Sequence, residues 1–542
     1  MLHFRPRLLD ELRGYDRGKF VADLTAGLTV AAVALPLAMA FAIASGLKPE
    51  AGLFTAIVAG FLISVLGGSR VQIGGPAGAF VVVVYAIVER YGVANLLLAT
   101  MMAGVLLLLM GAFRLGNLVR FVPVSIVIGF TNGIAVLIIL SQLRPFLGLR
   151  IDELPADFFH MLRALAQAAP SADPVTIALG VSSLGIIWGW PRLWRSGQGA
   201  AARFMRHVPG TIVGLAFGTL AVAILKLHVE TIGTRFGGIP QSLPPLAWPS
   251  LGWPELSLLF GPAFTIALLG SIESLLCARV ADAVIEDRHD PNQELMAQGI
   301  ANLVTPLLGG FCATGTIART MTNVRSGAKT PVAGIVHALS LLAVVLAAAP
   351  LASHIPLATL AAILIYVAYY MGEWHEFARL RQFSNYYRLI LLSTFVLTVV
   401  VDLTVAVQVG LMLACLFFIA RISGLTRVDA VESPQPGVEA YRISGSLFFG
   451  AVSKMDGLLD PRRPLPRILI LDLSQLLNMD TTGLETLETL HGMLVKRGGV
   501  LILAGVRDQP RGLLARSGLL ERLGPRNVAA TLEEAWLRAR TA

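Results

Sequence analysis

Between Leu24 and Arg421 the chain is a succession of apolar runs, most of them close to the roughly 20 residues that a helix needs to cross a lipid bilayer. Charged residues make up 14% of the 542 residues, whereas a soluble domain carries about 25%. Because a surface in contact with water needs charge, this composition excludes a soluble enzyme and a disordered or nucleic-acid-coating protein. The sequence therefore predicts a polytopic membrane protein.

The apolar runs predict fourteen membrane segments. Their approximate limits are 25–45, 50–67, 76–88, 94–113, 121–142, 174–191, 209–227, 260–283, 294–308, 316–327, 331–349, 356–371, 386–402 and 405–420. The segments at 76–88 and 316–327 are too short to cross a bilayer alone. They take the third and tenth positions, which is the same place in each half of seven segments.

Each short segment follows a glycine-rich stretch, at 67–76 and at 309–315. A repeat with an odd number of spans must insert its second copy upside down, and matched broken helices in inverted repeats indicate the midplane site of a secondary transporter. The alternative is that Gly and Pro merely kink two ordinary membrane helices, which such helices tolerate. We expect an all-α membrane domain at 24–421, with inverted repeats at about 24–228 and 258–421.

The chain carries 43 Lys and Arg residues against 34 Asp and Glu residues, a formal net charge of +9. The basic residues lie between apolar runs, where they set membrane orientation rather than bind nucleic acid. Residues 1–23 lack the features of a signal peptide and are predicted to be a cytoplasmic arm. An even number of spans returns the carboxyl terminus to the same side. We therefore expect a multi-pass protein of the inner (plasma) membrane with both termini cytoplasmic and the lipid bilayer as a partner.

After Arg421 the composition becomes charged and alternating. We expect a linker at 422–437 and a small α/β domain at 438–542 that folds in water. Strands are predicted at 441–452, 467–473 and 500–506, with an amphipathic helix at 482–496, because apolar residues recur there at helical spacing.

No cofactor or metal is expected. The three cysteines, Cys277, Cys312 and Cys415, lie inside apolar stretches without metal-ligand spacing, so neither a disulfide framework nor a zinc site is predicted. The glycine-rich stretches form no nucleotide-binding motif, and no Ser-His-Asp arrangement or paired carboxylates indicate an enzyme.

Several motifs resemble the SulP (sulfate permease) family of anion transporters, which is related to solute carrier family 26. They are PLAMAFA at 36–42, GLKP at 46–49, GGSR at 67–70, GSIESLL at 270–276, NQEL at 292–295, QGIAN at 298–302, ATGTIART at 313–320 and NVRSGAKTP at 323–331. The resemblance implies a core of spans 1–4 and 8–11 that moves like an elevator past a gate of spans 5–7 and 12–14. It also implies a homodimer and a C-terminal STAS domain.

Within this family the sequence looks closest to the bacterial C4-dicarboxylate transporters. Leu37 follows Pro36 where many sulfate transporters have glutamine, and the stretch 272–277 (IESLLC) is similar to that branch. The departure at Leu37 removes a polar group that could have contacted an anion.

The two half-helices predict an anion site. Their amino termini offer free N–H groups and about half a positive charge each, and small residues let an anion approach the backbone. The substrate-binding residues are predicted to be Ala77, Gly78, Ala79, Phe80, Gly315, Thr316, Ile317, Ala318 and Arg319. Matched positions in the resembling family support Arg319. The alternative is a structural arginine bonded to backbone carbonyls or paired with Glu273.

Glu273 is the conspicuous acid of span eight. A carboxylate there is costly when ionised, so Glu273 is predicted to couple a proton, or less readily sodium, to anion movement. The alternative is a permanent ion pair with Arg319. His337 also lies in an apolar span, where a hydrogen-bonded core histidine is expected rather than a proton relay.

In the C-terminal domain, Asp480-Thr481-Thr482-Gly483 precedes a helix. The tetrapeptide resembles the phosphorylation loop of bacterial anti-sigma factor antagonists, which would make Thr481 and Thr482 regulatory. Helix capping by Asp or Thr is the alternative that the residues favour.

We therefore expect a secondary-active anion transporter of the sulfate or C4-dicarboxylate class, coupled to a proton and working by alternating access. The alternatives are an uncoupled bicarbonate/chloride exchanger or an anion channel of the same fold, a membrane-tethered regulator, and a nucleobase transporter. The sequence leaves the small inorganic or organic anion open, because helix dipoles and one arginine suit sulfate, bicarbonate, chloride and C4-dicarboxylates alike.

Overall fold

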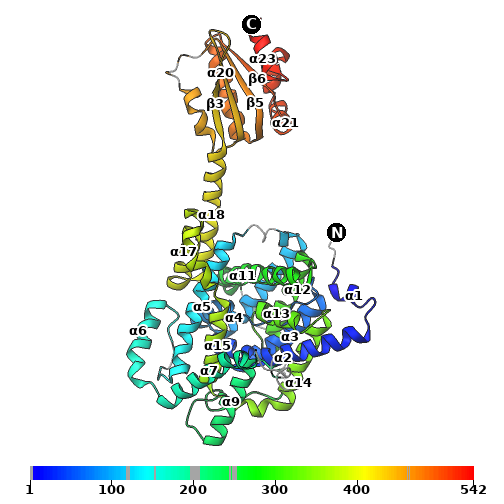
Figure 1. Ribbon diagram of the computed structural model, residues 1–542, viewed down its shortest axis with the longest axis vertical. Coiled ribbons are helices and arrows are strands. Elements are labelled where there is room, and N and C mark those ends of the chain that lie inside the picture. Colours follow the sequence, from blue (N-terminus) through cyan, green and yellow to red (C-terminus); the bar gives the residue numbers. More distant parts are fainter. Residues whose placement is uncertain are drawn as a thin grey trace. The chain divides into compact units, whose positions relative to one another are not determined.

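The computed structural model of the chain describes residues 4–117, 122–151, 154–195, 205, 208–242, 244, 246, 253–460, 462, 464 and 466–541. The chain forms two compact units, Met1–Leu411 and Met412–Ala542. The first is a helical bundle and the second is built around a sheet (Figure 1).

Each of the fourteen predicted segments corresponds to helical structure. The helices are α2 (Arg17–Ala44), α3 (Pro49–Leu66), α4 (Phe80–Ala112), α5 (Val124–Leu147), α7 (Pro174–Arg195), α9 (Gly210–Leu225), α11 (Trp253–Ile285), α12 (Pro291–Val304), α13 (Ile317–Arg325), α14 (Val332–Ala352), α15 (Leu357–Met371), α17 (Asn385–Val400) and α18 (Leu403–Leu425). Segments three and four both fall in α4, which turns at Gly92 (φ 81°). Eight described helices are long and apolar enough to cross a membrane.

Short elements connect these helices. They are α1 (Arg7–Glu11), α6 (Phe158–Ala168), α10 (Ile232–Phe236) and α16 (Trp374–Ala378). Helix α2 begins at Arg17, well before the predicted segment at 25–45, because Asp16 accepts a hydrogen bond from the Lys19 N–H (2.8 Å) and caps a polar first turn. The end of the predicted arm is therefore helical.

The helices pack in two groups. Helices α2, α3, α4, α11, α12, α13 and α14 contact one another in the first, and α5, α7, α9, α15 and α17 in the second. These groups hold the spans that the family resemblance assigned to the core and the gate, except for span fourteen, which falls in α18. Figure 1 shows α3 and α12 within the bundle, and these two helices contact each other.

The two half-helices start from one point in the first group. Strand β1 (Gly74–Gly75) leads toward α4, and strand β2 (Thr314–Gly315) leads into α13. The strands pair antiparallel, with Gly74 opposite Gly315 and Gly75 opposite Thr314. The two breaks are therefore not independent kinks, because their strands pair with each other. We call the paired strands β1 and β2 the crossing.

The second unit is an α/β fold. Its sheet has the order β3 (Arg427–Val431), β4 (Val438–Leu447), β5 (Ile468–Met479), β6 (Val500–Ala504) and β7 (Val528–Ala529). The pair β3–β4 is antiparallel and the other pairs are parallel. Its helices are α19 (Asp456–Leu459), α20 (Thr481–Lys496), α21 (Asp508–Arg516), α22 (Leu519–Leu523) and α23 (Leu532–Ala539).

Both faces of this sheet are covered. Leucines of α20 and α21 pack on one face, and Ala535 and Ala539 of α23 pack on the other. The stretch 422–437, expected to be a linker, contains the end of α18 and strand β3. Strand β3 was not predicted from hydropathy, because its side chains are half-buried or exposed and backbone hydrogen bonds to β4 hold it in the sheet.

The backbone of the β1–β2 pair predicts that a side chain at Gly75 is strained. Its φ is +150°, and a Cβ there would overlap Nη1 of Arg319. We expect Gly75→Ala to lower the free energy of unfolding in detergent by about 1–3 kcal/mol, because alanine is strained at this φ. Gly185→Ala is the matched control, because Gly185 lies in α7 with nothing within 4 Å of its Cβ position. Equal melting temperatures for the two variants would contradict this packing.

Candidate anion-binding site

The backbone of the crossing is satisfied by the protein. The Thr316 N–H donates to the Ile73 carbonyl (2.9 Å), and the Ile73 N–H donates to Oγ1 of Thr320 (2.9 Å). Irregular backbone is tolerated at membrane depth only where protein or a cavity satisfies it. These bonds tie the lead-in of each half-helix to the other repeat.

Helix α12 supports both lead-ins from one side. Asn302 accepts from the Ala313 N–H (2.8 Å) and donates to the Ala313 carbonyl (2.8 Å). The buried Glu294 carboxylate accepts from the N–H groups of Gly68 (2.9 Å) and Ser69 (3.2 Å). The motifs NQEL and QGIAN, which the sequence singled out, therefore hold the crossing in place.

The predicted substrate-binding residues lie at the starts of the two half-helices. Ala77, Gly78 and Ala79 precede α4, Phe80 begins it, and all four are buried. Gly315 and Thr316 are buried before α13, whereas Ile317 and Ala318 at its first turn are exposed. The structure brings both sets to the β1–β2 crossing.

Neither helix start is capped by a side chain. The residues at the cap positions, Ala79 and Thr316, make no side-chain hydrogen bond to the first turn. The Thr316 hydroxyl instead donates to the Ile73 carbonyl (3.1 Å). At α4 the N–H groups of Phe80 and Val81 donate to the carbonyls of Ala77 and Gly78 (both 3.1 Å). The first N–H groups of α13 are the ones that keep their capacity to bind an anion.

Arg319 occupies the third position of α13. Its side chain is 1% exposed and lies against Gly75, the second residue of β1. Neither Nη1 nor Nη2 has a hydrogen-bond partner among the described residues. Backbone carbonyls therefore do not hold these two nitrogens, in contrast to the alternative considered from the sequence. Among the described residues the guanidinium also has no counter-charge.

Glu273 lies on α11 close to the crossing. One turn earlier, the Gly270 carbonyl accepts from Oγ1 of Thr314 (2.9 Å), and a Cβ at Gly270 would lie 3.3 Å from the Phe80 ring. The side chain of Glu273 is half-buried. Among the ion pairs of the described residues none joins Glu273 to Arg319, so the permanent pair considered from the sequence is absent.

Met371 and Gln72 are neighbours of the site that were not predicted. A Cβ at Gly78 would lie 3.3 Å from Sδ of Met371 and 3.3 Å from Cε1 of Phe41. Gln72 donates to Oγ of Ser274 (2.9 Å) and lies against Gly315. Met371 ends an apolar helix and gives no sequence signal, whereas Gln72 could have been noticed as an amide beside the glycine-rich lead-in.

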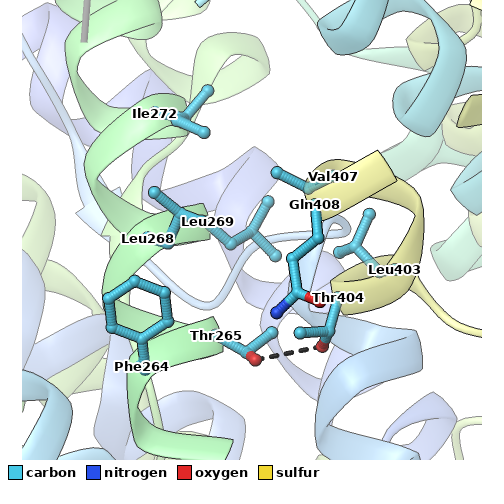
Figure 2. A pocket seen from close by; sticks show the side chains of 9 residues that line it. All are labelled: Phe264, Thr265, Leu268, Leu269, Ile272, Leu403, Thr404, Val407 and Gln408. Atoms are coloured by element: carbon cyan, nitrogen blue, oxygen red, sulfur yellow. Dashed lines mark hydrogen bonds between the residues drawn. The ribbon is translucent and has the colours of Figure 1, made fainter. Parts of the chain in front are cut away.

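A separate small crevice lies between α11 and α18. Figure 2 shows the Gln408 side chain directed toward the crevice, beside the hydrogen bond between the hydroxyls of Thr265 and Thr404 (3.0 Å). Its lining holds none of the predicted site residues, although Ile272 precedes Glu273. Within the described parts of the chain, no three His, Cys, Asp or Glu side chains are grouped to hold a metal ion.

In the second unit, Asp480 caps α20. Its carboxylate accepts from the N–H groups of Gly483 (2.8 Å) and Phe449 (3.0 Å). Thr481 is exposed and Thr482 is half-buried. Capping is therefore performed by the aspartate, and the regulatory role of the two threonines stays a prediction.

The chain matches two family models. Residues 20–394 match the sulfate permease family and residues 431–535 match the STAS domain. The domain limits predicted from the sequence stay predictions beside these ranges. Because the first match covers more than half of the chain, the protein belongs to the sulfate permease family.

Two named relatives are similar to this chain over nearly its whole length. A putative sulfate transporter of Bacillus subtilis, YvdB, is 42% identical over 96% of this chain and 97% of its own. The bicarbonate transporter BicA of a Picosynechococcus species is 31% identical over 95% of this chain and 93% of its own. These names do not support the closer resemblance to C4-dicarboxylate transporters.

Solved structures agree with the fold. The transmembrane domain of a cyanobacterial BicA has a TM-score of 0.65 and 32% identity, over 73% of this chain and 98% of that one. SLC26A9 has a TM-score of 0.86 over 98% of this chain and 92% of that one, with 17% identity, which shows the fold alone. The protein is thus a multi-pass anion transporter, and its relatives are transporters rather than enzymes.

The contact between the two repeats predicts a role for the Thr320 hydroxyl. Removing it leaves the buried Ile73 N–H without an acceptor. We expect Thr320→Val to lower the free energy of unfolding in detergent by about 1–3 kcal/mol. In the matched variant Thr322→Val, the lost bond runs to the Ala318 carbonyl within the same helix, and we expect a change within about 0.5 kcal/mol. A Thr320→Val variant as stable as Thr322→Val would contradict the assigned bond.

Proposed function

We propose that the protein is a secondary-active transporter that binds a small anion between the amino termini of α4 and α13. The observation that carries the proposal is the guanidinium of Arg319, which is buried at the crossing, where Nη1 and Nη2 have no partner among the residues that the structure describes. A buried cation without a counter-charge is costly at membrane depth. A bound anion would remove that cost.

The electrostatics of the crossing favour an anion over other solutes. Two uncapped helix starts contribute about half a positive charge each, and the Arg319 side chain adds a full one. Hydrogen bonds from backbone N–H groups to an anion are stronger than neutral ones. The substrate class that fits is sulfate or bicarbonate, the anions named for the relatives YvdB and BicA, with C4-dicarboxylates as a further class to test.

Glu273 supplies the proposed coupling group. An anion accumulated against a negative-inside potential needs a co-transported cation, and a half-buried carboxyl near the crossing can carry a proton. Sodium is the less favoured coupling ion. Movement of the first helix group against the second would expose the site alternately on the two sides, in an elevator motion.

The assembly, the membrane location and the domain limits are proposed from the family resemblance and the sequence. We propose a homodimer in the inner (plasma) membrane with cytoplasmic termini. The proposed domain limits are 1–23 for the arm, 24–421 for the transport domain and 438–542 for the STAS domain, with a connection at 422–437 whose strand β3 joins the sheet of the STAS domain.

Replacing Arg319 tests the site. We expect Arg319→Ala to reduce uptake of labelled sulfate or bicarbonate into proteoliposomes at least about a hundredfold, since a desolvated charged hydrogen bond is worth about 3 kcal/mol or more. Arg325→Ala is the matched control, because Arg325 ends the same helix and is exposed. Uptake by Arg319→Ala at the wild-type rate, with a folded protein, would rule out the site.

Replacing Glu273 tests the coupling. Glu273→Gln keeps the shape of the side chain but cannot exchange a proton, so we expect concentrative uptake to vanish while exchange between the two sides of the membrane remains. Glu286→Gln is the matched control, because Glu286 follows α11 and is exposed. Accumulation driven by a proton gradient that is unchanged in Glu273→Gln would exclude the role. A large current that does not saturate with anion would instead indicate a channel.

A further inference from the structure

His337 is a buried imidazole without a hydrogen-bond partner. It lies in α14, is 0% exposed, and neither Nδ1 nor Nε2 is bonded to any described residue. A neutral imidazole always carries one N–H donor and one acceptor nitrogen, and buried polar groups are nearly always bonded. The expectation of a hydrogen-bonded core histidine is therefore wrong, and the imidazole needs another explanation.

The imidazole and the Arg319 guanidinium lie along one face of α3. A Cβ at Gly60 would lie 3.4 Å from Cε1 of His337 and 3.2 Å from the Gly74 carbonyl oxygen. One turn away on α3, the Cα of Ala56 lies 3.5 Å from the Cβ position of Gly75, where Arg319 also packs. Successive turns of α3 thus contact successive residues of β1.

Among the described residues, Arg319 is the charged group that acts electrostatically on His337. Helix α14 packs against α2 and α3. From α3 the neighbours are Gly60 and Ser64, the latter against Gly334, and neither ionises. From α2 comes the carboxylate of Asp23, which accepts from the N–H groups of Lys329 (2.7 Å) and Thr330 (3.0 Å). Thr330 lies seven residues before His337, roughly 10 Å along the helix.

We propose that His337 binds a proton when an anion occupies the site at Arg319, so that imidazole and guanidinium hold the anion's charge together. The inference rests on the proposed anion site and names a second group that carries a proton there. Without an anion, a proton on the imidazole would face the positive guanidinium in surroundings of low polarity, which is unfavourable. With an anion present, the same proton is attracted.

This linkage is reciprocal. If an anion increases the affinity of His337 for a proton, a proton on His337 increases the affinity for the anion by the same factor. Histidine is suited to this task because its charge changes near neutral pH. The proton on His337 adds positive charge next to the anion, whereas a proton on Glu273 removes negative charge on α11, so the two groups make separable contributions.

Sulfate is the appropriate probe, because it remains a dianion between about pH 5.5 and about pH 8, whereas bicarbonate itself titrates. The measurement is the Kd of labelled sulfate for the full-length protein in detergent at both pH values. We expect the wild-type Kd to be about tenfold larger at the higher pH, and His337→Gln to reduce this ratio at least about threefold. His354→Gln is the matched control, because His354 lies just after α14 and is exposed.

The outcomes separate this inference from the proposed function. Sulfate binding that keeps its wild-type pH ratio in His337→Gln overturns the role of His337 and leaves the anion site intact. Sulfate binding that is absent from the wild type, or survives Arg319→Ala, overturns the site and this inference with it. If His337→Gln does not fold, the second measurement is the number of protons that the protein takes up when sulfate is added. It is made on the wild type and on Glu273→Gln. An absence of uptake in Glu273→Gln overturns the role, whereas uptake supports it.

Discussion

The pairing of Gly74 with Gly315 and of Gly75 with Thr314 fixes where the two half-helices of the bundle start. Irregular backbone at membrane depth has to be satisfied by protein, and here β1 and β2 satisfy each other across the two repeats. Thr320, Asn302 and Glu294 provide further bonds to the lead-ins. Because both half-helices leave from this crossing, their amino termini must lie close together, and the positive ends of two helices meet at one point.

The crossing concentrates positive charge, and the described part of the chain supplies no negative partner for it. The guanidinium of Arg319 packs on Gly75, and the imidazole of His337 lies one turn of α3 away, beside Gly74. Burying such groups without partners lowers stability. A site that is destabilised when empty gains affinity for the anion that completes it, which links the architecture of the sulfate permease family to anion transport in this chain.

Hydropathy and matched glycine-rich breaks were enough to predict the fourteen segments and the meeting of two half-helices, because both are local properties of the sequence. The start of α2 at Arg17 was missed because a polar helical turn carries no hydropathy signal, and β3 because its half-buried or exposed strand is held by backbone bonds. Arg319 was singled out by its residue type. The unpartnered state of His337 could not be predicted, since it depends on which groups three other elements place around the ring.

The central claim is that an anion lies between the starts of α4 and α13. An experimental structure with selenate, a heavier analogue of sulfate, tests it most directly through the anomalous signal of selenium. The account predicts a peak within hydrogen-bond distance of Arg319 or of the first backbone N–H groups of the two half-helices. Selenate bound elsewhere in the helical unit, with the crossing unoccupied at saturating concentration, would contradict it.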